Sequence, residues 1–178
     1  ILPYFTEYYG NASGIYGVAK ESKKALEHAR EQVAHAIGAR KDEIIFTAGG
    51  SESDNMALRG VAEALAEKGK HIITTQIEHH AILHTCAYLE KKAFRVTYLP
   101  VDEMGKVDPA AVEAAICPDT ILISIMFANN EIGTIEPIAQ IGAIAKKHRV
   151  LFHTDAVQAV GHVKIDVEAM QIDLLSMS

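Results

Sequence analysis

Apolar and polar positions along the chain follow two periods, and their alternation predicts strands separated by helices. Helical spacing covers residues 18–37, 51–68, 81–92, a short segment from Pro109, and 137–149. Short apolar runs of strand length cover residues 44–47, 71–75, 94–99, 120–127, 150–154 and 173–178. Strands joined through helices imply right-handed crossovers. The pattern therefore predicts an α/β fold, with a mostly parallel central sheet and helices on both faces.

Composition excludes several classes of protein. The chain has 178 residues, of which 49% are hydrophobic, and this is enough for one well-buried domain. Its net charge of −6 and the lack of a basic stripe argue against nucleic-acid binding. No apolar run is long enough to predict a membrane span. Two cysteines, Cys86 and Cys117, are too few for a disulfide framework, and we expect buried thiols in a reducing cytoplasm.

Small and polar residues follow most of the predicted strands. In open α/β sheets, ligands bind outside the carboxyl ends of the strands. The segments at these ends are Thr47-Ala48-Gly49-Gly50-Ser51, Gln76-Ile77-Glu78-His79-His80, Ala128-Asn129-Asn130-Glu131, Asp155-Ala156-Val157-Gln158 and the terminal Ser178. Side chains of these kinds are suited to an anionic, planar ligand that contains nitrogen.

Gly49, Gly50 and Ser51 begin a predicted helix and form a candidate phosphate site. Two glycines allow backbone N–H groups to approach an anion, the helix N-terminus favours negative charge, and the serine adds a hydroxyl. The alternative is an ordinary tight turn in which Ser51 caps the helix.

Asp155 and His79 are candidates for contact with the ring of such a ligand. A carboxylate at the end of a buried strand, with the amide of Gln158 three residues on, is suited to hold a pyridine nitrogen protonated. An imidazole at His79 is suited to stacking on the ring or to proton transfer near neutral pH. The alternatives are a helix cap at Asp155 and an ordinary helix-start histidine at His79.

A metal hydrolase is a competing hypothesis. His80 and His84 have metal-ligand spacing on a helix, and His153 and Asp155 point to one face of a strand. Neither cysteine has a Cys-x-x-Cys partner, so further ligands are lacking.

Taken together, these segments resemble the cysteine desulfurases of iron–sulfur cluster assembly, in the class V branch of the fold-type-I pyridoxal-phosphate enzymes. The resemblance covers essentially the whole chain. Its matching segments are Tyr9-Gly10-Asn11-Ala12-Ser13, Ile45-Phe46-Thr47-Ala48-Gly49-Gly50-Ser51-Glu52-Ser53-Asp54-Asn55, Glu78-His79-His80-Ala81, Asn129-Asn130-Glu131-Ile132-Gly133-Thr134-Ile135, His153-Thr154-Asp155-Ala156-Val157-Gln158 and Asp173-Leu174-Leu175-Ser176-Met177-Ser178.

The resemblance implies pyridoxal 5'-phosphate as cofactor and assigns roles to its ligands. Gly50, Ser51 and Ser178 would bind the phosphate, and Asp155 would pair with the pyridinium nitrogen.

Three further residues are assigned to the ring itself. His79 would stack over it and act catalytically in proton transfer, Gln158 would bond its phenolic oxygen, and Asn130 would lie near that oxygen on the substrate side. No metal is implied.

The resemblance also implies an activity and partners. L-cysteine would be converted to L-alanine, and its sulfur would pass to an enzyme cysteine as a persulfide and then to an acceptor or iron–sulfur scaffold protein. A cytoplasmic homodimer is expected, without nucleic acid or membrane. Alternatives are another class V enzyme, such as a selenocysteine lyase or an aminotransferase, and a non-catalytic fragment.

Residues 1–178 are expected to form part of the large cofactor domain. In the family pattern, the Schiff-base lysine would follow directly after Ser178, and a small C-terminal domain would carry the sulfur-accepting cysteine. An N-terminal strand region would come before. We therefore expect the 178 residues alone to be inactive.

Overall fold

The computed structural model describes residues 2–178 and divides the chain into two compact units, Ile1–Phe46 and Thr47–Ser178. The first unit is helical and contains α1 (Pro3–Thr6), α2 (Gly17–Ile37) and the short 3-10 helix η1 (Lys41–Glu43). Helix α2 ends where Gly38 adopts a left-handed conformation with φ of 72°, which glycine adopts without strain. The helix predicted over residues 18–37 is confirmed.

The second unit is built on a five-stranded parallel sheet with strand order β2-β1-β3-β4-β5. The strand bounds are His71–Thr75 (β1), Arg95–Leu99 (β2), Thr120–Ser124 (β3), Leu151–Asp155 (β4) and Leu174–Ser176 (β5). Strands β1 and β3 are buried along their full length, as expected for strands covered on both faces. The predicted parallel sheet is confirmed.

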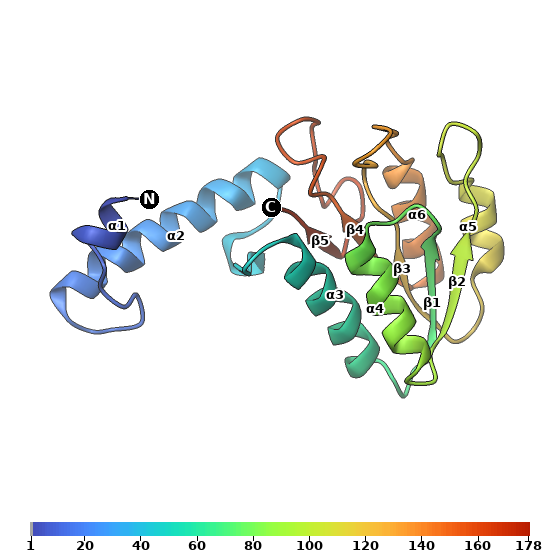
Figure 1. Ribbon diagram of the computed structural model, residues 1–178, viewed down its shortest axis with the longest axis horizontal. Helices are drawn as coiled ribbons and strands as arrows, with labels where there is room; N and C mark the ends of the chain where they lie inside the picture. Colours follow the sequence, from blue (N-terminus) through green and yellow to red (C-terminus); the bar gives the residue numbers. More distant parts are fainter. Residues whose placement is uncertain (1) are drawn as a thin grey trace. The chain divides into compact units, whose positions relative to one another are not determined.

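Four helices cover the sheet: α3 (Gly50–Ala64), α4 (His80–Glu90), α5 (Pro109–Ala115) and α6 (Ile138–His148). Helices α3 and α4 lie side by side on one face, and α5 and α6 lie on the other (Figure 1). Leu58 of α3 and Ile82 and Cys86 of α4 pack against Ile72 and Leu122 of the sheet in one buried apolar cluster. The core thus spans the interface between this helix pair and the central strands.

The strand order reverses next to β1, and this reversal positions the functional site. The connection from β1 to β2 runs in one direction along the sheet, and the connection from β2 to β3 runs back past β1. Right-handed crossovers then require α4 and α5 to lie on opposite faces. The loops that follow β1 and β3 consequently diverge at the carboxyl edge of the sheet, where doubly wound proteins bind ligands.

The strand predicted at residues 44–47 is wrong. These residues have no strand conformation, and the Ile45 and Phe46 side chains are 65% and 46% exposed. The Ile44 carbonyl accepts a hydrogen bond from the Arg30 side chain, and not from the backbone of a neighbouring strand. An apolar run becomes a strand only where a partner edge is available. Other elements are shorter than predicted, notably α3, which ends at Ala64, β3, which ends at Ser124, and β5, which covers only Leu174–Ser176.

Within residues 2–178, no helix combines the length and the apolar character needed to cross a bilayer.

We predict opposite effects for alanine at two helical glycines. A Cβ atom at Gly142 in α6 would lie 2.0 Å from the Met170 carbonyl oxygen, whereas one at Gly60 in α3 would meet nothing within 4 Å. Gly142→Ala should lower the free energy of unfolding by about 1–3 kcal/mol through overpacking. The matched control Gly60→Ala should raise it by up to about 1 kcal/mol through helix propensity. Urea unfolding measures both, and equal effects would contradict the packing described for α6.

Candidate functional site

The Glu78 carboxyl joins the two loops that diverge at the carboxyl edge. Its Oε1 atom accepts hydrogen bonds from the Thr75 hydroxyl at 2.6 Å and from the Met126 N–H at 3.0 Å. The Asn129 amide also donates to the Ile77 carbonyl at 3.1 Å. The loop after β1 and the loop after β3 are therefore tied together by buried polar contacts.

A cluster of two carboxylates and one imidazole lies at this edge. One side-chain atom from each of Asp54, His79 and Asp155 lies within 4.8 Å of the other two. Asp54 and Asp155 are 1% and 6% exposed, whereas His79 is exposed. Asp155 ends β4, and its Oδ1 atom accepts from the Val157 N–H at 3.0 Å. The cluster thus has a buried acidic floor and an imidazole on its open side.

His79 is also the N-cap residue of α4. Its Nδ1 atom accepts a hydrogen bond from the Ala81 N–H at 3.2 Å, so the side chain caps the helix. Helix capping and contact with a ring ligand are compatible roles for His79, because capping occupies Nδ1 and leaves Nε2 as the protonated nitrogen. The cap fixes the imidazole beside Asp155.

Burial raises the pKa of all three acidic groups near this edge. The pKa of Glu78 rises to about 8 because the carboxyl is buried. Burial, followed by the charge of Asp155, raises the pKa of Asp54 to about 7. Burial also raises the pKa of Asp155, although the Val157 N–H opposes the shift. Asp54 Oδ1 and Glu78 Oε2 have no hydrogen-bond partner among the described residues. A cationic N–H group here would favour the ionised carboxylates.

His153 supports the site without reaching solvent. Its Nδ1 lies 2.9 Å from the Ser124 hydroxyl and its Nε2 3.0 Å from the Ser176 hydroxyl. Burial lowers its pKa to about 3, so the ring is neutral at physiological pH. Its Nε2 lies 3.8 Å from Asp54 Oδ1, directly beneath the acidic cluster.

The metal-hydrolase alternative is not supported. His80 and His84 stack on each other along α4, with ring centroids 5.4 Å apart. Among residues 2–178, the two side-chain groups with metal-binding geometry are His71-Cys117-Asp119 and Asp54-His79-Asp155. Neither group contains His80, His84 or His153, so the proposed ligands do not converge.

The start of α3 requires glycine at two successive positions. Gly49 adopts φ 156° and ψ 178°, a region that is essentially restricted to glycine. A Cβ atom at Gly50 would lie 2.7 Å from Val157 Cγ2, so only glycine fits without displacing the segment that follows Asp155. The helix N-terminus and the segment after β4 thus approach closely at this edge.

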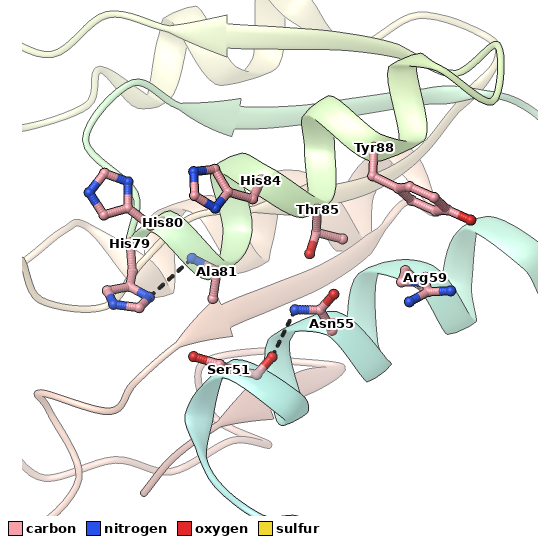
Figure 2. Close-up of a pocket in the computed structure, with 9 residues that line it drawn as sticks. All are labelled: Ser51, Asn55, Arg59, His79, His80, Ala81, His84, Thr85 and Tyr88. Atoms are coloured by element: carbon pink, nitrogen blue, oxygen red, sulfur yellow. Dashed lines mark hydrogen bonds between the residues drawn. The ribbon is translucent and has the colours of Figure 1, made fainter.

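A cavity of about 490 Å³ lies between α3 and α4 (Figure 2). Ser51, Asn55 and Arg59 line it from α3, and His79 and Tyr88 lie on the opposite wall. The predicted residues Ser51 and His79 therefore share one open space, as an anionic ring ligand requires.

Other predicted residues are exposed at the same edge. The side chains of Asn130, Gln158 and Ser178 are all exposed. The preceding Asn129 is instead buried, and its Oδ1 accepts from the N–H groups of Glu131 and Ile132 at 2.9 and 3.0 Å. Asn129 shapes the turn, and Asn130 is the residue left facing solvent.

Sequence reasoning assigned no role to the buried acids Asp54 and Glu78. Asp54 had a detectable signal, because it lies one turn before the apolar position Leu58 on the buried face of α3. Glu78 had no such signal within its polar loop. Cys86 is buried as predicted, but Cys117 is only partly buried and its Sγ lies 3.0 Å from His71 Nδ1, so that prediction is wrong for Cys117.

The doubly wound parallel sheet defines an α/β protein, whose carboxyl edge carries the acidic cluster and the start of α3. The family model for class V aminotransferases matches residues 1–178. The chain belongs to this family, which uses pyridoxal phosphate.

Similar proteins support the resemblance to cysteine desulfurases. The cysteine desulfurase IscS of Methanosarcina thermophila is 62% identical over 178 residues, which are 100% of this chain and 44% of the relative. The structure of SspA in complex with cysteine has a TM-score of 0.96 at 43% identity, over 99% of this chain and 51% of that one. A NifS-like protein has a TM-score of 0.96 at 41% identity, over 99% and 49%. The chain spans less than half the length of the curated relative.

We predict that Glu78 makes stability fall as pH rises. Its pKa is about 8 in the folded protein against an ordinary value of 4.5, so the folded state binds more protons between these values. Its contribution is complete below about pH 4.5 and is lost toward pH 8, with a slope of at most about 1.4 kcal/mol per unit. Glu78→Gln keeps the accepting oxygen and removes this dependence, as urea unfolding from pH 5 to 8 would measure.

The exposed control Glu63→Gln should follow the wild-type curve. Parallel curves for wild type and Glu78→Gln would show that Glu78 is ionised in the folded protein.

Proposed function

We propose that this chain binds pyridoxal 5'-phosphate and forms the cofactor-binding part of a cysteine desulfurase. The observation that carries the proposal is the Asp54-His79-Asp155 cluster, two buried carboxylates beside an exposed imidazole at the carboxyl edge of the sheet. When bound, the cofactor supplies an electron sink that stabilises negative charge on the substrate carbon.

The residues present fit the ring of this cofactor. Asp155 would accept a hydrogen bond from the pyridinium N–H, and its ionised form would hold that proton in place. Burial raises the pKa of Asp155, and a cation is the partner that reverses this shift. His79, fixed by its bond to the Ala81 N–H, would stack over the ring and transfer a proton at its free nitrogen. Gln158 and Asn130 would contact the phenolic oxygen and the substrate side.

The start of α3 fits the phosphate. Its free N–H groups and the exposed Ser51 hydroxyl favour an anion, and Gly50 leaves room for close approach beside Val157. Ser178 would add a second hydroxyl. The helix N-terminus and the acidic floor would thus bind opposite charges of one molecule, which fixes its orientation.

Similarity to cysteine desulfurases supports L-cysteine as the substrate, with L-alanine as product and sulfur transferred to an enzyme cysteine. We infer that the 178 residues alone do not supply that cysteine. Cys86 is fully buried, and burial raises its pKa to about 12, so it is not a nucleophile. Cys117 lies near the amino end of β3, away from the cofactor edge.

We further propose a cytoplasmic homodimer that delivers sulfur to an acceptor or iron–sulfur scaffold protein. Two free cysteines support a reducing compartment. Large exposed apolar side chains in the first unit support association, among them Phe5 at 74%, Tyr9 at 73% and Ile15 at 95% exposure.

Cofactor binding tests the proposal directly. Pyridoxal phosphate should acquire induced circular dichroism on titration with the chain, and Asp155→Asn should weaken binding about 10–100-fold, because a charged hydrogen bond is lost. Asp108→Asn is the matched control. Asp108 caps α5 by accepting from the Ala110 N–H at 2.9 Å, and asparagine caps equally well. Equal affinity for wild type and Asp155→Asn would refute the assignment.

A turnover assay tests the inference about the cysteines. With L-cysteine, pyridoxal phosphate and a thiol reductant, the 178-residue chain should form no alanine above a cofactor-only control. Alanine formation that Cys117→Ser abolishes would overturn the inference and make Cys117 the sulfur acceptor. Alanine formation that survives this substitution would place the acceptor role at another group and would also contradict the inference.

A further inference from the structure

A second polar cluster lies at the amino edge of the sheet, opposite the cofactor edge. One ligand atom from each of His71, Cys117 and Asp119 lies within 4.8 Å of the other two. His71 begins β1, and Cys117 and Asp119 lie in the loop between α5 and β3. All strands of the parallel sheet begin at this edge, so the cluster is separate from Asp155 at the end of β4.

Hydrogen bonds fix the orientation of His71 and accommodate the tautomer that a metal ligand needs. Its Nδ1 lies 2.7 Å from Thr120 Oγ1, and its Nε2 lies 2.8 Å from Thr97 Oγ1. Thr120 Oγ1 already accepts from the Cys117 N–H at 2.9 Å, so its own hydrogen is available for Nδ1. When the Thr120 hydroxyl donates to Nδ1, Nε2 carries the ring proton and donates it to Thr97 Oγ1. A histidine whose second nitrogen donates to a fixed neighbour is the arrangement found in metal sites.

The unprotonated Nδ1 of His71, which accepts from the Thr120 hydroxyl, also faces the cysteine. Nδ1 lies 3.0 Å from Cys117 Sγ, and this sulfur lies 3.1 Å from Asp119 Oδ1. His71 is fully buried, whereas Cys117 and Asp119 are partly exposed. An imidazole, a thiol and a carboxylate therefore converge at an accessible edge.

A cationic group already caps this cluster. Arg95 Nη2 donates to Cys117 Sγ at 3.0 Å and to Asp119 Oδ1 at 2.9 Å. The Arg95 side chain is 56% exposed, and such a surface ion pair is weak. Cys117 and Asp119 thus already bind a positive charge, and the Arg95 side chain that supplies it is largely exposed to solvent.

We propose that His71 Nδ1, Cys117 Sγ and the Asp119 carboxylate bind a zinc-class divalent ion, with water as the fourth ligand. Nitrogen, sulfur and oxygen donors together suit Zn²⁺ better than Mg²⁺ or Ca²⁺, which prefer oxygen alone. The ion would displace Arg95, and the thiol proton would pass to solvent. The Thr120 hydroxyl, 3.2 Å from Cys117 Sγ, would then donate to the thiolate.

The ligand spacing requires one small adjustment. Metal–ligand bonds of about 2.0–2.3 Å in a tetrahedron place the donor atoms about 3.5 Å apart. The present spacings from Cys117 Sγ are 3.0 Å to His71 Nδ1 and 3.1 Å to Asp119 Oδ1, so the donors must separate by about 0.5 Å. His71 is held by the sheet, and the movement falls on the partly exposed loop residues.

Cobalt titration of the 178-residue chain tests the proposal. Co²⁺ occupies zinc sites and gives a near-ultraviolet charge-transfer band only when a thiolate is bound. The band should appear with wild type, disappear in Cys117→Ser, and persist in the matched control Cys86→Ala. No band with wild type, or a band that survives in Cys117→Ser, would overturn the proposal. Far-ultraviolet circular dichroism would confirm that each variant is folded.

Displacement of Co²⁺ by Zn²⁺ then compares the zinc affinity of two further variants with that of wild type. Thr97→Val removes the acceptor of the Nε2 proton and should weaken binding about 10–100-fold. Arg95→Gln removes the competing cation and should tighten binding by up to about fivefold. Weaker binding by Arg95→Gln would mean that the guanidinium supports the site, and would contradict the displacement on which the proposal depends.

Discussion

The hydrogen bonds of the Glu78 carboxyl are the constraint on which the cofactor edge depends. Strands β1 and β3 are neighbours in the sheet but are separated along the chain by α4, β2 and α5. Glu78 Oε1 accepts from the end of β1 and from the loop after β3, and so it joins these segments where their paths diverge. Without this link, the hydrogen bond from the Asn129 amide to the Ile77 carbonyl would be left to join the loop that carries His79 to the loop that carries Asn130.

The same contact explains why the site concentrates acidic groups in its interior. A buried carboxyl that accepts two hydrogen bonds is useful as an anchor only if its charge is suppressed or neutralised. Burial raises the pKa of Glu78 to about 8, so the anchor is mostly protonated at neutral pH. Asp54 and Asp155 lie beside the exposed His79, where a bound cation would neutralise them. The neutral His153 beneath Asp54 adds no opposing charge of its own.

The sequence predicted the positions of helices and strands better than it predicted which segments lie next to each other in the fold. Helical and strand periods identified α2 and β1 nearly to their ends, because burial of one face imposes a period on the residues. The apolar residues 44–47 have the same local character but no strand beside them, and periodicity contains no information about partners. His71 and Cys117 meet for a related reason. They are 46 residues apart, and only the strand order brings them together.

Among the residues of the candidate site, Asp155, Ser51 and His79 were singled out from the sequence, whereas Asp54 and Glu78 were not. Asp155, Ser51 and His79 follow strands or begin helices, where side chains rarely serve packing alone. Asp54 lies on the buried face of α3, and its role depends on β4 ending beneath it. Such a contact follows from the packing of a helix on a sheet, which a single sequence does not specify.

The topology of the sheet explains why its two edges favour ligands of opposite charge. Crossover helices run antiparallel to the strands, so their N-termini lie at the carboxyl edge and their C-termini at the amino edge. The partial positive charge at the start of α3 therefore lies where an anion is expected, beside Gly50 and Ser51. The end of α5 lies just before Cys117, at the edge where Arg95 is bound. The helix dipoles thus oppose a cation at the first edge and favour one at the second. An anionic cofactor at one edge and a divalent cation at the other agree with this polarity.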